Sequence, residues 1–324
     1  MIVDGKKVQL FALSSNKRIA EEISRESGIP LSSCTISRFA DGEISLNIDD
    51  SVRGNHIFVV QSTSKPVNEN LMEVLIMCDA LKRASASSIT IIMPYFGYSR
   101  QDRKAKSRQP ITAKLVADLM QTAGANRVIS IDLHAGQIQG FFDIPIDNFP
   151  AAPLLASRFD KIRHEDIVVV SPDHGGTTRA RAFARFFDAS IAIIDKRRPE
   201  PNVAVAMNVI GEVKGKTCIL IDDIIDTGGT LVAATEALLA EGAVKVYACA
   251  THAVFSDDAL QKLENSRMEK IVVTNTIDHP EIKASKKIIV LSIGELLGKS
   301  ICNIVKDEPI SQIFENIYKD RDKA

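Results

Sequence analysis

The stretch Cys218–Thr230 reads CILIDDIIDTGGT and combines an apolar run, two adjacent carboxylates and a turn rich in glycine and threonine. The apolar run predicts a buried β-strand that delivers Asp222 and Asp223 to its carboxyl end. The turn Asp226–Thr230 leads into a helical pattern, so backbone N–H groups and threonine hydroxyls can surround an anion there. Carboxylates repel phosphate but accept hydrogen bonds from hydroxyls, so the segment predicts a site for a phosphorylated polyol. The alternative is a helix start with a tight turn and no ligand.

Similar units of strand and helix run outward from this segment in both directions. Several apolar runs lack polar alternation, which predicts strands that are buried on both faces. The predicted strands are Val8–Leu13, Ile57–Gln61, Ile89–Met93, Arg127–Asp132, Ile167–Ser171, Ser190–Asp195, Thr217–Asp222, Lys245–Ala250 and Lys270–Thr274. The predicted helices are Asn68–Arg83, Ile111–Ala123, Gly176–Phe186, Gly229–Glu241 and Asp257–Asn265. This order predicts an α/β fold with mainly parallel sheets flanked by helices, and ligand sites at the carboxyl ends of strands.

An internal repeat divides the chain into halves. The pattern of Asp79–Phe96 returns in Glu236–Phe255. The strand at Val60 pairs with Ile221, the strand that ends at Leu13 pairs with Pro172, and Arg38–Asp41 falls opposite Asp195–Arg198, each at a separation of about half the chain. We therefore expect two similar domains, residues 1–149 and 150–324, with a junction near Phe149–Pro153, where two prolines interrupt the pattern. The alternative is the general likeness of any two α/β domains. The halves differ in one respect: Ser62–Asn70 (STSKPVNEN), the counterpart of the DDIIDTGGT segment, lacks the acidic pair and the Gly-Gly.

The composition excludes several classes of protein. The chain has 324 residues, of which 45% are apolar and 25% charged, as expected for packed domains rather than a disordered chain. A formal net charge of −1 argues against a general nucleic-acid binder. The five cysteines are scattered, which indicates core residues in a reducing compartment. No apolar run has the length of a membrane span or a signal peptide, so we expect a cytoplasmic protein without membrane or nucleic-acid partners.

Two segments in the first half suit a nucleotide. The stretch Tyr95–Arg108 (YFGYSRQDRKAKSR) follows a predicted strand and is strongly basic. It fits either a solvated surface loop or a polyphosphate site, and bidentate arginine contacts favour polyphosphate. In the segment RFADGE, the ring of Phe39 can stack on a base while Asp41 and Glu43 accept hydrogen bonds from amino or hydroxyl groups.

Three further residues or segments stand at strand ends. Asp195–Pro199 (DKRRP) carries three cations that can close over a reacting phosphate and neutralise developing charge. His134 in DLHAGQ and Asp173 in SPDHGG each follow a predicted strand. Carboxylate oxygens suit Mg²⁺ whereas imidazole is a less usual ligand for it, so these residues alone leave metal binding and a structural role both open.

Together these segments resemble the ribose-phosphate pyrophosphokinase family over essentially the whole chain. The matching motifs, in the order of the family, are FADGEI, FGYSRQDRK, DLHAGQIQGFFDIP, SPDHGG, DKRRP and DDIIDTGGT. The last motif alone also occurs in phosphoribosyltransferases, which consume 5-phosphoribosyl 1-diphosphate (PRPP) and have about half this length. The resemblance implies two phosphoribosyltransferase-like domains and Mg²⁺-dependent transfer of the diphosphoryl group of ATP to the anomeric hydroxyl of ribose 5-phosphate, giving PRPP and AMP.

The resemblance also implies roles for individual residues. The implied ATP contacts are Phe39, Asp41, Gly42, Glu43, Arg100, Gln101 and Asp102. The implied ribose 5-phosphate contacts are Arg198, Asp222, Asp223, Asp226, Thr227, Gly228, Gly229 and Thr230. His134 and Asp173 match Mg²⁺ positions, and Lys196 and Arg198 match a mobile catalytic loop. The presence of all four favours an active enzyme over one alternative, a non-catalytic regulatory homologue. The nucleotide-like first half argues against the other alternative, a phosphoribosyltransferase.

Assembly and regulation follow from the same resemblance. Family members form hexamers, require phosphate and are inhibited by ADP, and their FADGE loop reaches into a neighbouring ATP site. Ser51, Arg53, Arg103 and Ser311 lie in the regions that correspond to the regulatory site. The segment Lys106–Gln109 departs from the usual wording of its loop, which affects the regulatory prediction more than the catalytic one.

Overall fold

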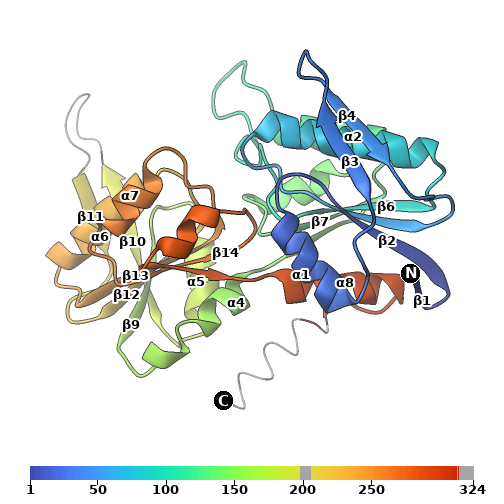
Figure 1. Cartoon of the computed structure of the whole chain (residues 1–324). Helices are drawn as coiled ribbons and strands as arrows, with labels where there is room; N and C mark the ends of the chain where they lie inside the picture. The colour runs from blue at the N-terminus through green and yellow to red at the C-terminus, as the bar shows by residue number, and fades with distance from the viewer. Residues whose placement is uncertain (198–205, 312, 314–324) are drawn as a thin grey trace. The chain divides into compact units, whose positions relative to one another are not determined.

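The computed structural model describes residues 1–197, 206–311 and 313 (Figure 1). The chain divides into two compact units. The first contains residues 1–150, 276–278 and the chain from 292 onward, and the second contains residues 151–275 and 279–291. The predicted single cut at 149/150 therefore does not describe the C-terminal segment, which the structure assigns to the first unit.

Helix packing explains this difference. Helix α8 (Gly294–Val305) lies against α1 (Lys17–Ser27), near the N-terminus of the chain (Figure 1). The two helices approach closely because glycines face α1. A Cβ atom added at Gly294 or Gly298 would lie only 2.6 Å from the Cβ of Glu22 or Glu26. Sequence reasoning predicted neither helix, although α1 has a narrow apolar stripe that includes Ile19 and Ile23.

The first unit is built on a six-stranded sheet of order β1-β2-β5-β6-β7-β8. Its strands are β1 (Ile2–Val3), β2 (Lys6–Ala12), β5 (His56–Val60), β6 (Ser88–Met93), β7 (Arg127–Ile131) and β8 (Ile146–Phe149). All neighbours are parallel except β1 and β2. Helices α2 (Val67–Arg83) and α3 (Thr112–Ala123) cover one face, where Val74 and Val116 pack with strand residues such as Val59 and Ile91.

A separate hairpin joins this unit. Strands β3 (Cys34–Arg38) and β4 (Ile44–Ile48) pair with each other as a two-stranded antiparallel sheet. The half-buried side chains of Ile36 and Leu46 pack against the core beneath α2, and the FADGE turn lies at the hairpin's end. Sequence reasoning missed both strands because each is short and its apolar alternation is incomplete.

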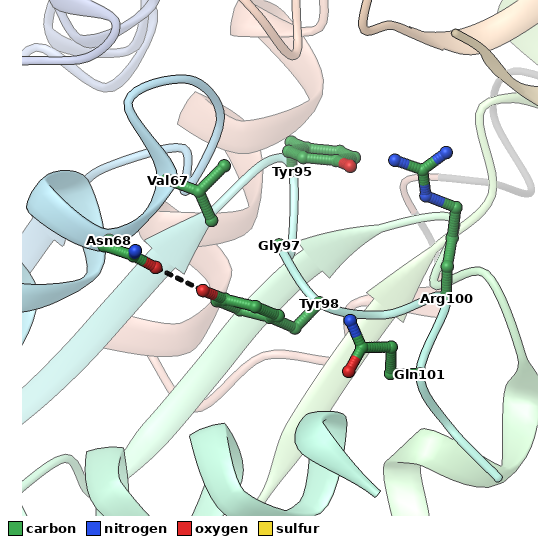
Figure 2. A pocket seen from close by; sticks show the side chains of 7 residues that line it. All are labelled: Val67, Asn68, Tyr95, Gly97, Tyr98, Arg100 and Gln101. Carbon is green, nitrogen blue, oxygen red and sulfur yellow. Dashed lines mark hydrogen bonds between the residues drawn. The ribbon is translucent and has the colours of Figure 1, made fainter. Parts of the chain in front are cut away.

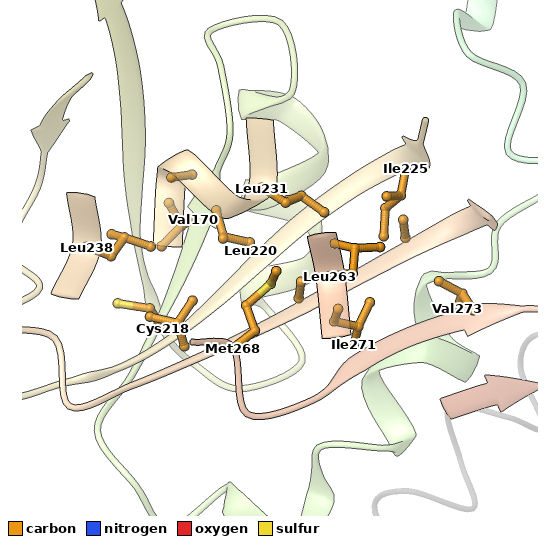
Figure 3. Packing of buried hydrophobic residues seen from close by; sticks show 14 of the residues in the cluster. Val170, Cys218, Leu220, Ile225, Leu231, Leu238, Leu263, Met268, Ile271 and Val273 are labelled. Carbon is orange, nitrogen blue, oxygen red and sulfur yellow. The ribbon is translucent and has the colours of Figure 1, made fainter. Parts of the chain in front are cut away.

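The second unit has a seven-stranded sheet of order β11-β10-β9-β12-β13-β14-β15. Its strands are β9 (Ile167–Ser171), β10 (Ser190–Arg197), β11 (Ala206–Ile210), β12 (Thr217–Ile225), β13 (Lys245–Ala253), β14 (Ile271–Thr274) and β15 (Ile288–Leu291). Its helices are α4 (Ala152–Ser157), α5 (Thr177–Ala184), α6 (Gly229–Ala240) and α7 (Ala259–Glu264). Only β10 and β11 pair antiparallel. Figure 3 shows strand residues such as Leu220 and Ile271 packed against Leu231 of α6 and Leu263 of α7.

The two sheets repeat one topology. The parallel order β2-β5-β6-β7-β8 of the first unit matches β9-β12-β13-β14-β15 of the second. Each unit also places a hairpin between its first two parallel strands, β3–β4 in one and β10–β11 in the other. The predicted α/β fold with two similar, mainly parallel domains is therefore confirmed. In the described part of the chain, no helix is long and apolar enough to cross a membrane.

Candidate functional site

The acidic pair lies inside strand β12. The sequence had predicted it at the carboxyl end of that strand. Strand β12 continues to Ile225 because residues beyond Asp222 still pair with β13, including Ile224 with His252. Asp223 is buried and Asp222 is partly buried. The extension carries both carboxylates on a rigid element next to the glycine-rich turn, a more precise support than a loop provides.

Arg179 bridges the two acids, a contact that sequence reasoning missed. Its Nη1 lies 3.1 Å from Oδ1 of Asp222, and its Nη2 lies 3.1 Å from Oδ1 of Asp223. Burial and the neighbouring Asp223 raise the pKa of Asp222 to about 7, while Arg179 lowers it. A clue to this contact was the position of Arg179 in the first turn of α5, just after the SPDHGG segment. That segment follows β9, and β9 is adjacent to β12, which carries the two acids.

The glycine-rich turn leads directly into helix α6. Gly228 adopts a left-handed conformation with φ of 73°, and an added Cβ would lie 3.2 Å from Leu263 of α7. Thr227, Gly229 and Thr230 are exposed around the helix start. An α-helix leaves its first N–H groups without intrahelical acceptors and carries partial positive charge at this end. The turn therefore presents donors to solvent in the arrangement that an anion requires.

The segment after β9 carries the predicted metal ligand of the second unit. Asp173 is exposed, and its Oδ1 accepts a 3.0 Å hydrogen bond from the backbone N–H of Gly176. The adjacent His174 contacts Asp195 at 3.0 Å between Nε2 and Oδ1. Among the described residues, no group of three or more His, Cys, Asp or Glu side chains could hold a metal ion. An exposed carboxylate still fits Mg²⁺, because this ion usually keeps several waters and binds protein through one or two carboxylates.

The other predicted metal ligand, His134, is partly buried and follows β7 in the first unit. Asp173 belongs to the second unit. Mg²⁺ binding at either residue stays a prediction.

A pocket of about 300 Å³ lies beside the start of α2 in the first unit (Figure 2). Its lining residues are Val67, Asn68, Tyr95, Gly97, Tyr98, Arg100 and Gln101. The hydroxyl of Tyr98 donates a hydrogen bond to the side chain of Asn68 across the pocket. Arg100 and Gln101, both predicted ATP contacts, line this pocket. The two tyrosines lie in the quoted segment Tyr95–Arg108 but were assigned no role, and neither was Asn68.

Gly97 allows its backbone to approach the backbone of Thr63 closely beside the pocket. Its N–H donates a 2.6 Å hydrogen bond to Oγ1 of Thr63, and an added Cβ would lie 2.4 Å from the carbonyl oxygen of Thr63. The residue after the pocket, Asp102, is buried and accepts a hydrogen bond from Gln137 of the DLHAGQ segment. This bond ties the basic loop to the end of β7, and contact between Asp102 and ATP stays a prediction.

The FADGE turn presents an aromatic ring to solvent. Phe39 is 58% exposed at the end of the β3–β4 hairpin. The turn is closed by backbone bonds between Phe39 and Glu43, by Gly42 with φ of 95°, and by a 3.1 Å bond from the N–H of Glu43 to Oδ1 of Asp41. Arg38, just before the turn, reaches Oε2 of Glu69 on α2 at 2.6 Å. The ring is thus held outward on a fixed hairpin.

The remaining predicted residues stay untested. Lys196 pairs with Met207 in the antiparallel β10–β11 ladder, and Arg198 lies outside the described residues. All four predicted regulatory residues, Ser51, Arg53, Arg103 and Ser311, are exposed. The Nη1 of Arg53 donates a 3.1 Å hydrogen bond to the hydroxyl of Ser85.

The duplicated parallel sheets, and the acidic pair beside an exposed turn, are the features expected of the ribose-phosphate pyrophosphokinase family. Residues 8–124 match the family described as the N-terminal domain of ribose phosphate pyrophosphokinase. Residues 194–315 match the phosphoribosyl synthetase-associated domain.

Individual relatives agree with these matches. The ribose-phosphate pyrophosphokinase of Bacillus caldolyticus is 58% identical over 309 residues, covering 95% of this chain and 98% of the relative. Ribose-phosphate pyrophosphokinase 1 of Listeria innocua is 58% identical over 311 residues, with the same coverage of 95% and 98%. The solved structure of phosphoribosylpyrophosphate synthetase from Mycobacterium smegmatis is similar, with a TM-score of 0.89, 44% identity and coverage of 93% of this chain and 100% of that one. The chain belongs to the ribose-phosphate pyrophosphokinase family.

Proposed function

We propose that this chain transfers the diphosphoryl group of ATP to the anomeric hydroxyl of ribose 5-phosphate, giving PRPP and AMP. The family supports the reaction, because relatives of that name match nearly the whole chain at 58% identity. The observation that carries the proposal is the acidic pair Asp222–Asp223 on β12, directly beside the exposed turn at the start of α6.

The second unit is the proposed sugar site. The ribose hydroxyls donate hydrogen bonds to Asp222 and Asp223, and the 5-phosphate binds the exposed turn Asp226–Thr230 with its threonine hydroxyls and helix N–H groups. Phosphate and carboxylates repel, so a ligand with hydroxyls at one end and a phosphate at the other fits in one orientation. That orientation presents the anomeric hydroxyl away from the 5-phosphate.

The first unit is the proposed source of nucleotide contacts. Phe39 is proposed to stack on the adenine, with Asp41, Gly42 and Glu43 beside the base and ribose. Its exposure on a fixed hairpin supports that role. Arg100 and Gln101, which line the pocket of Figure 2, are proposed to contact the phosphates, with Asp102 behind them. The two tyrosines of the same pocket add aromatic surface for the nucleotide.

The chemistry requires in-line attack of the anomeric hydroxyl on the β-phosphorus with departure of AMP. Lys196 and Arg198 are the proposed catalytic residues, because cations near the transferred group stabilise charge that spreads over its oxygens in the transition state. Asp173 and His134 are the proposed holders of Mg²⁺, which when bound neutralises charge on the diphosphoryl group. No residue is assigned as general base.

The proposed setting follows the family. We propose a cytoplasmic homo-oligomer, a hexamer, that phosphate activates and ADP inhibits through the region of Ser51, Arg53, Arg103 and Ser311. The exposure of these side chains and their place in the sequence support that region.

The test is a direct assay with Mg-ATP, ribose 5-phosphate and inorganic phosphate, with AMP and PRPP quantified. Equimolar AMP and PRPP are expected, and no AMP would exclude the reaction. Lys196→Ala should lower turnover by orders of magnitude while leaving ribose 5-phosphate binding intact. Lys214→Ala, which removes an exposed cation from the same unit, is the matched control and should retain full turnover. Equal loss of sugar binding in Lys196→Ala would overturn its catalytic role.

A further inference from the structure

Arg179 holds the two acids of the sugar site in one geometry. The two guanidinium nitrogens lie at equal distances of 3.1 Å from an Oδ1 of Asp222 and an Oδ1 of Asp223. Successive side chains of a strand normally point to opposite faces, so a planar fork that reaches both acids restricts the rotamers of both. The fork comes from α5, an element that contributes no other residue to the proposed sugar contacts.

The inner oxygen of Asp222 is fully engaged by this arrangement. Its Oδ1 accepts from Arg179 at 3.1 Å and from the backbone N–H of Asp223 at 2.9 Å. Two donors on one carboxylate oxygen direct the second oxygen, Oδ2, elsewhere. Arg179 therefore determines which edge of Asp222 a ligand meets.

The same contact offsets an electrostatic conflict. Two adjacent carboxylates, one of them buried, repel each other, and burial together with Asp223 raises the pKa of Asp222. Arg179 is the neighbouring cation that lowers it, and the backbone N–H of Asp223 lowers it further. Cys249 of β13 also lies near Asp222, and burial and Asp222 raise the pKa of its thiol. Arg179 is thus the cation that favours the ionised, hydrogen-bond-accepting form of the pair.

We propose that Arg179 is a positioning residue of the sugar subsite, which fixes Asp222 and Asp223 so that they accept hydrogen bonds from two neighbouring ribose hydroxyls. This inference rests on the proposed function. Arg179 acts through the two carboxylates and makes no contact with the reacting atoms. A lysine at this position supplies charge but only one point of contact, so it restores ionisation of the acids without their joint orientation.

The experiment compares Arg179→Met, Arg179→Lys and the control Arg181→Met, an exposed arginine two residues along the same helix. For each full-length variant, kcat and KM are measured separately for ribose 5-phosphate and for ATP. We expect Arg179→Met to lower kcat/KM for ribose 5-phosphate about 100-fold, Arg179→Lys to lower it by less, and both to keep KM for ATP within about twofold. Arg181→Met should match the parent chain. Equal changes for ATP and the sugar, or no change for the sugar, would overturn the proposal.

A pH profile separates positioning from general loss of structure. The acid limb of kcat/KM for ribose 5-phosphate should move to higher pH in Arg179→Met, because the cation that lowers the pKa of Asp222 is gone. Arg179→Lys should leave the limb near its original position, and it carries the test if Arg179→Met fails to fold. An unmoved limb in a folded Arg179→Met would count against the inference.

Titration calorimetry with ribose 5-phosphate alone distinguishes this inference from the proposed function. If the parent chain produces no AMP yet binds the sugar, and Arg179→Met binds it far more weakly, the reaction assignment fails while the positioning role stands. If the parent turns over and the variants bind the sugar equally well, the positioning role fails alone.

Discussion

The loop after β5 and the loop after β12 occupy the same place in the repeated topology but begin differently. Residues 61–64, directly after β5, are all buried, although Lys65, Pro66, Asn68 and Glu69 beyond them are exposed. Gln61 there accepts from Ser15 through both its N–H and its hydroxyl, at 2.9 and 2.8 Å, and donates to Glu73 at 2.8 Å. After β12, by contrast, Thr227, Gly229 and Thr230 are exposed at the start of α6.

The difference shows that a position at a strand end in this fold does not by itself make a ligand site. In the first unit the polar groups directly after the strand form hydrogen bonds with one another, so this part of the loop is buried and closed to a ligand. Glu73 accepts further bonds from the N–H and hydroxyl of Ser14, and Gly97 packs on Thr63. The pocket of that unit is built mainly one loop further along, from residues 95–101, together with Val67 and Asn68 at the start of α2. In the second unit the acids are held from one side and the helix start is open.

The largest expected effect comes from the open loop. Asp223→Asn should lower kcat/KM for ribose 5-phosphate at least about 100-fold, because a charged acceptor for a sugar hydroxyl and for Arg179 is lost. Steady-state kinetics with the sugar as varied substrate checks this. Ser62→Ala, in the corresponding segment of the first unit, removes a hydroxyl that bonds the backbone of Thr276 and should leave sugar kinetics unchanged. Equal effects of the two variants would break the comparison.

The sealed loop should respond in stability. Glu73→Ala removes a buried carboxylate that accepts from the buried amide of Gln61 and from the N–H and hydroxyl of Ser14, at a cost of about 2–4 kcal/mol in the free energy of unfolding. Urea unfolding followed by circular dichroism measures this change. Glu69→Ala removes an exposed carboxylate from the same helix, one that pairs with Arg38, and should cost less than about 1 kcal/mol. Similar costs for both variants would show that the buried network does not stabilise the first unit.

A smaller effect is expected at the turn itself. Gly228→Ala forces a left-handed conformation on alanine and brings its Cβ within 3.2 Å of Leu263, so stability should fall by about 1–2 kcal/mol. At Gly229 an added Cβ meets no atom within 4 Å, and Gly229→Ala should leave stability within about 0.5 kcal/mol. Thermal unfolding of the two variants side by side is the measurement. A costlier Gly229→Ala would contradict the backbone explanation.

The last expected effect is a pH dependence. The pKa of Asp222 is raised to about 7, so the folded state retains a proton that the unfolded chain releases near pH 4. Asp222 therefore lowers stability progressively as pH rises from about 4 to about 7, and by a constant amount above that. Asp222→Asn removes this effect, so it should stabilise the protein more at pH 8 than at pH 5 while impairing sugar turnover. Unfolding curves at both pH values test the sign.

Much of the fold was readable from periodicity. All the predicted strands and helices occur, because long apolar runs such as Ile167–Ser171 leave few alternatives. The short hairpin β3–β4 was missed because half-exposed strands carry weak patterns, and α8 was assigned to the second half because order along the chain does not reveal which unit a terminal helix packs on. At the site, the DDIIDTGGT and RQD segments were assigned roles from the sequence, whereas Arg179, Tyr98 and Asn68 were not.

The sequence by itself determined the duplicated α/β architecture, the family and the segments that end its strands, since these depend on local periodicity and on motifs of consecutive residues. Only the tertiary structure decided that β12 extends past the acidic pair, that Arg179 spans both acids, and that Gln61 and Glu73 close the equivalent loop. These contacts join residues far apart in the chain. Their existence depends on sheet register and side-chain direction, which no local pattern specifies.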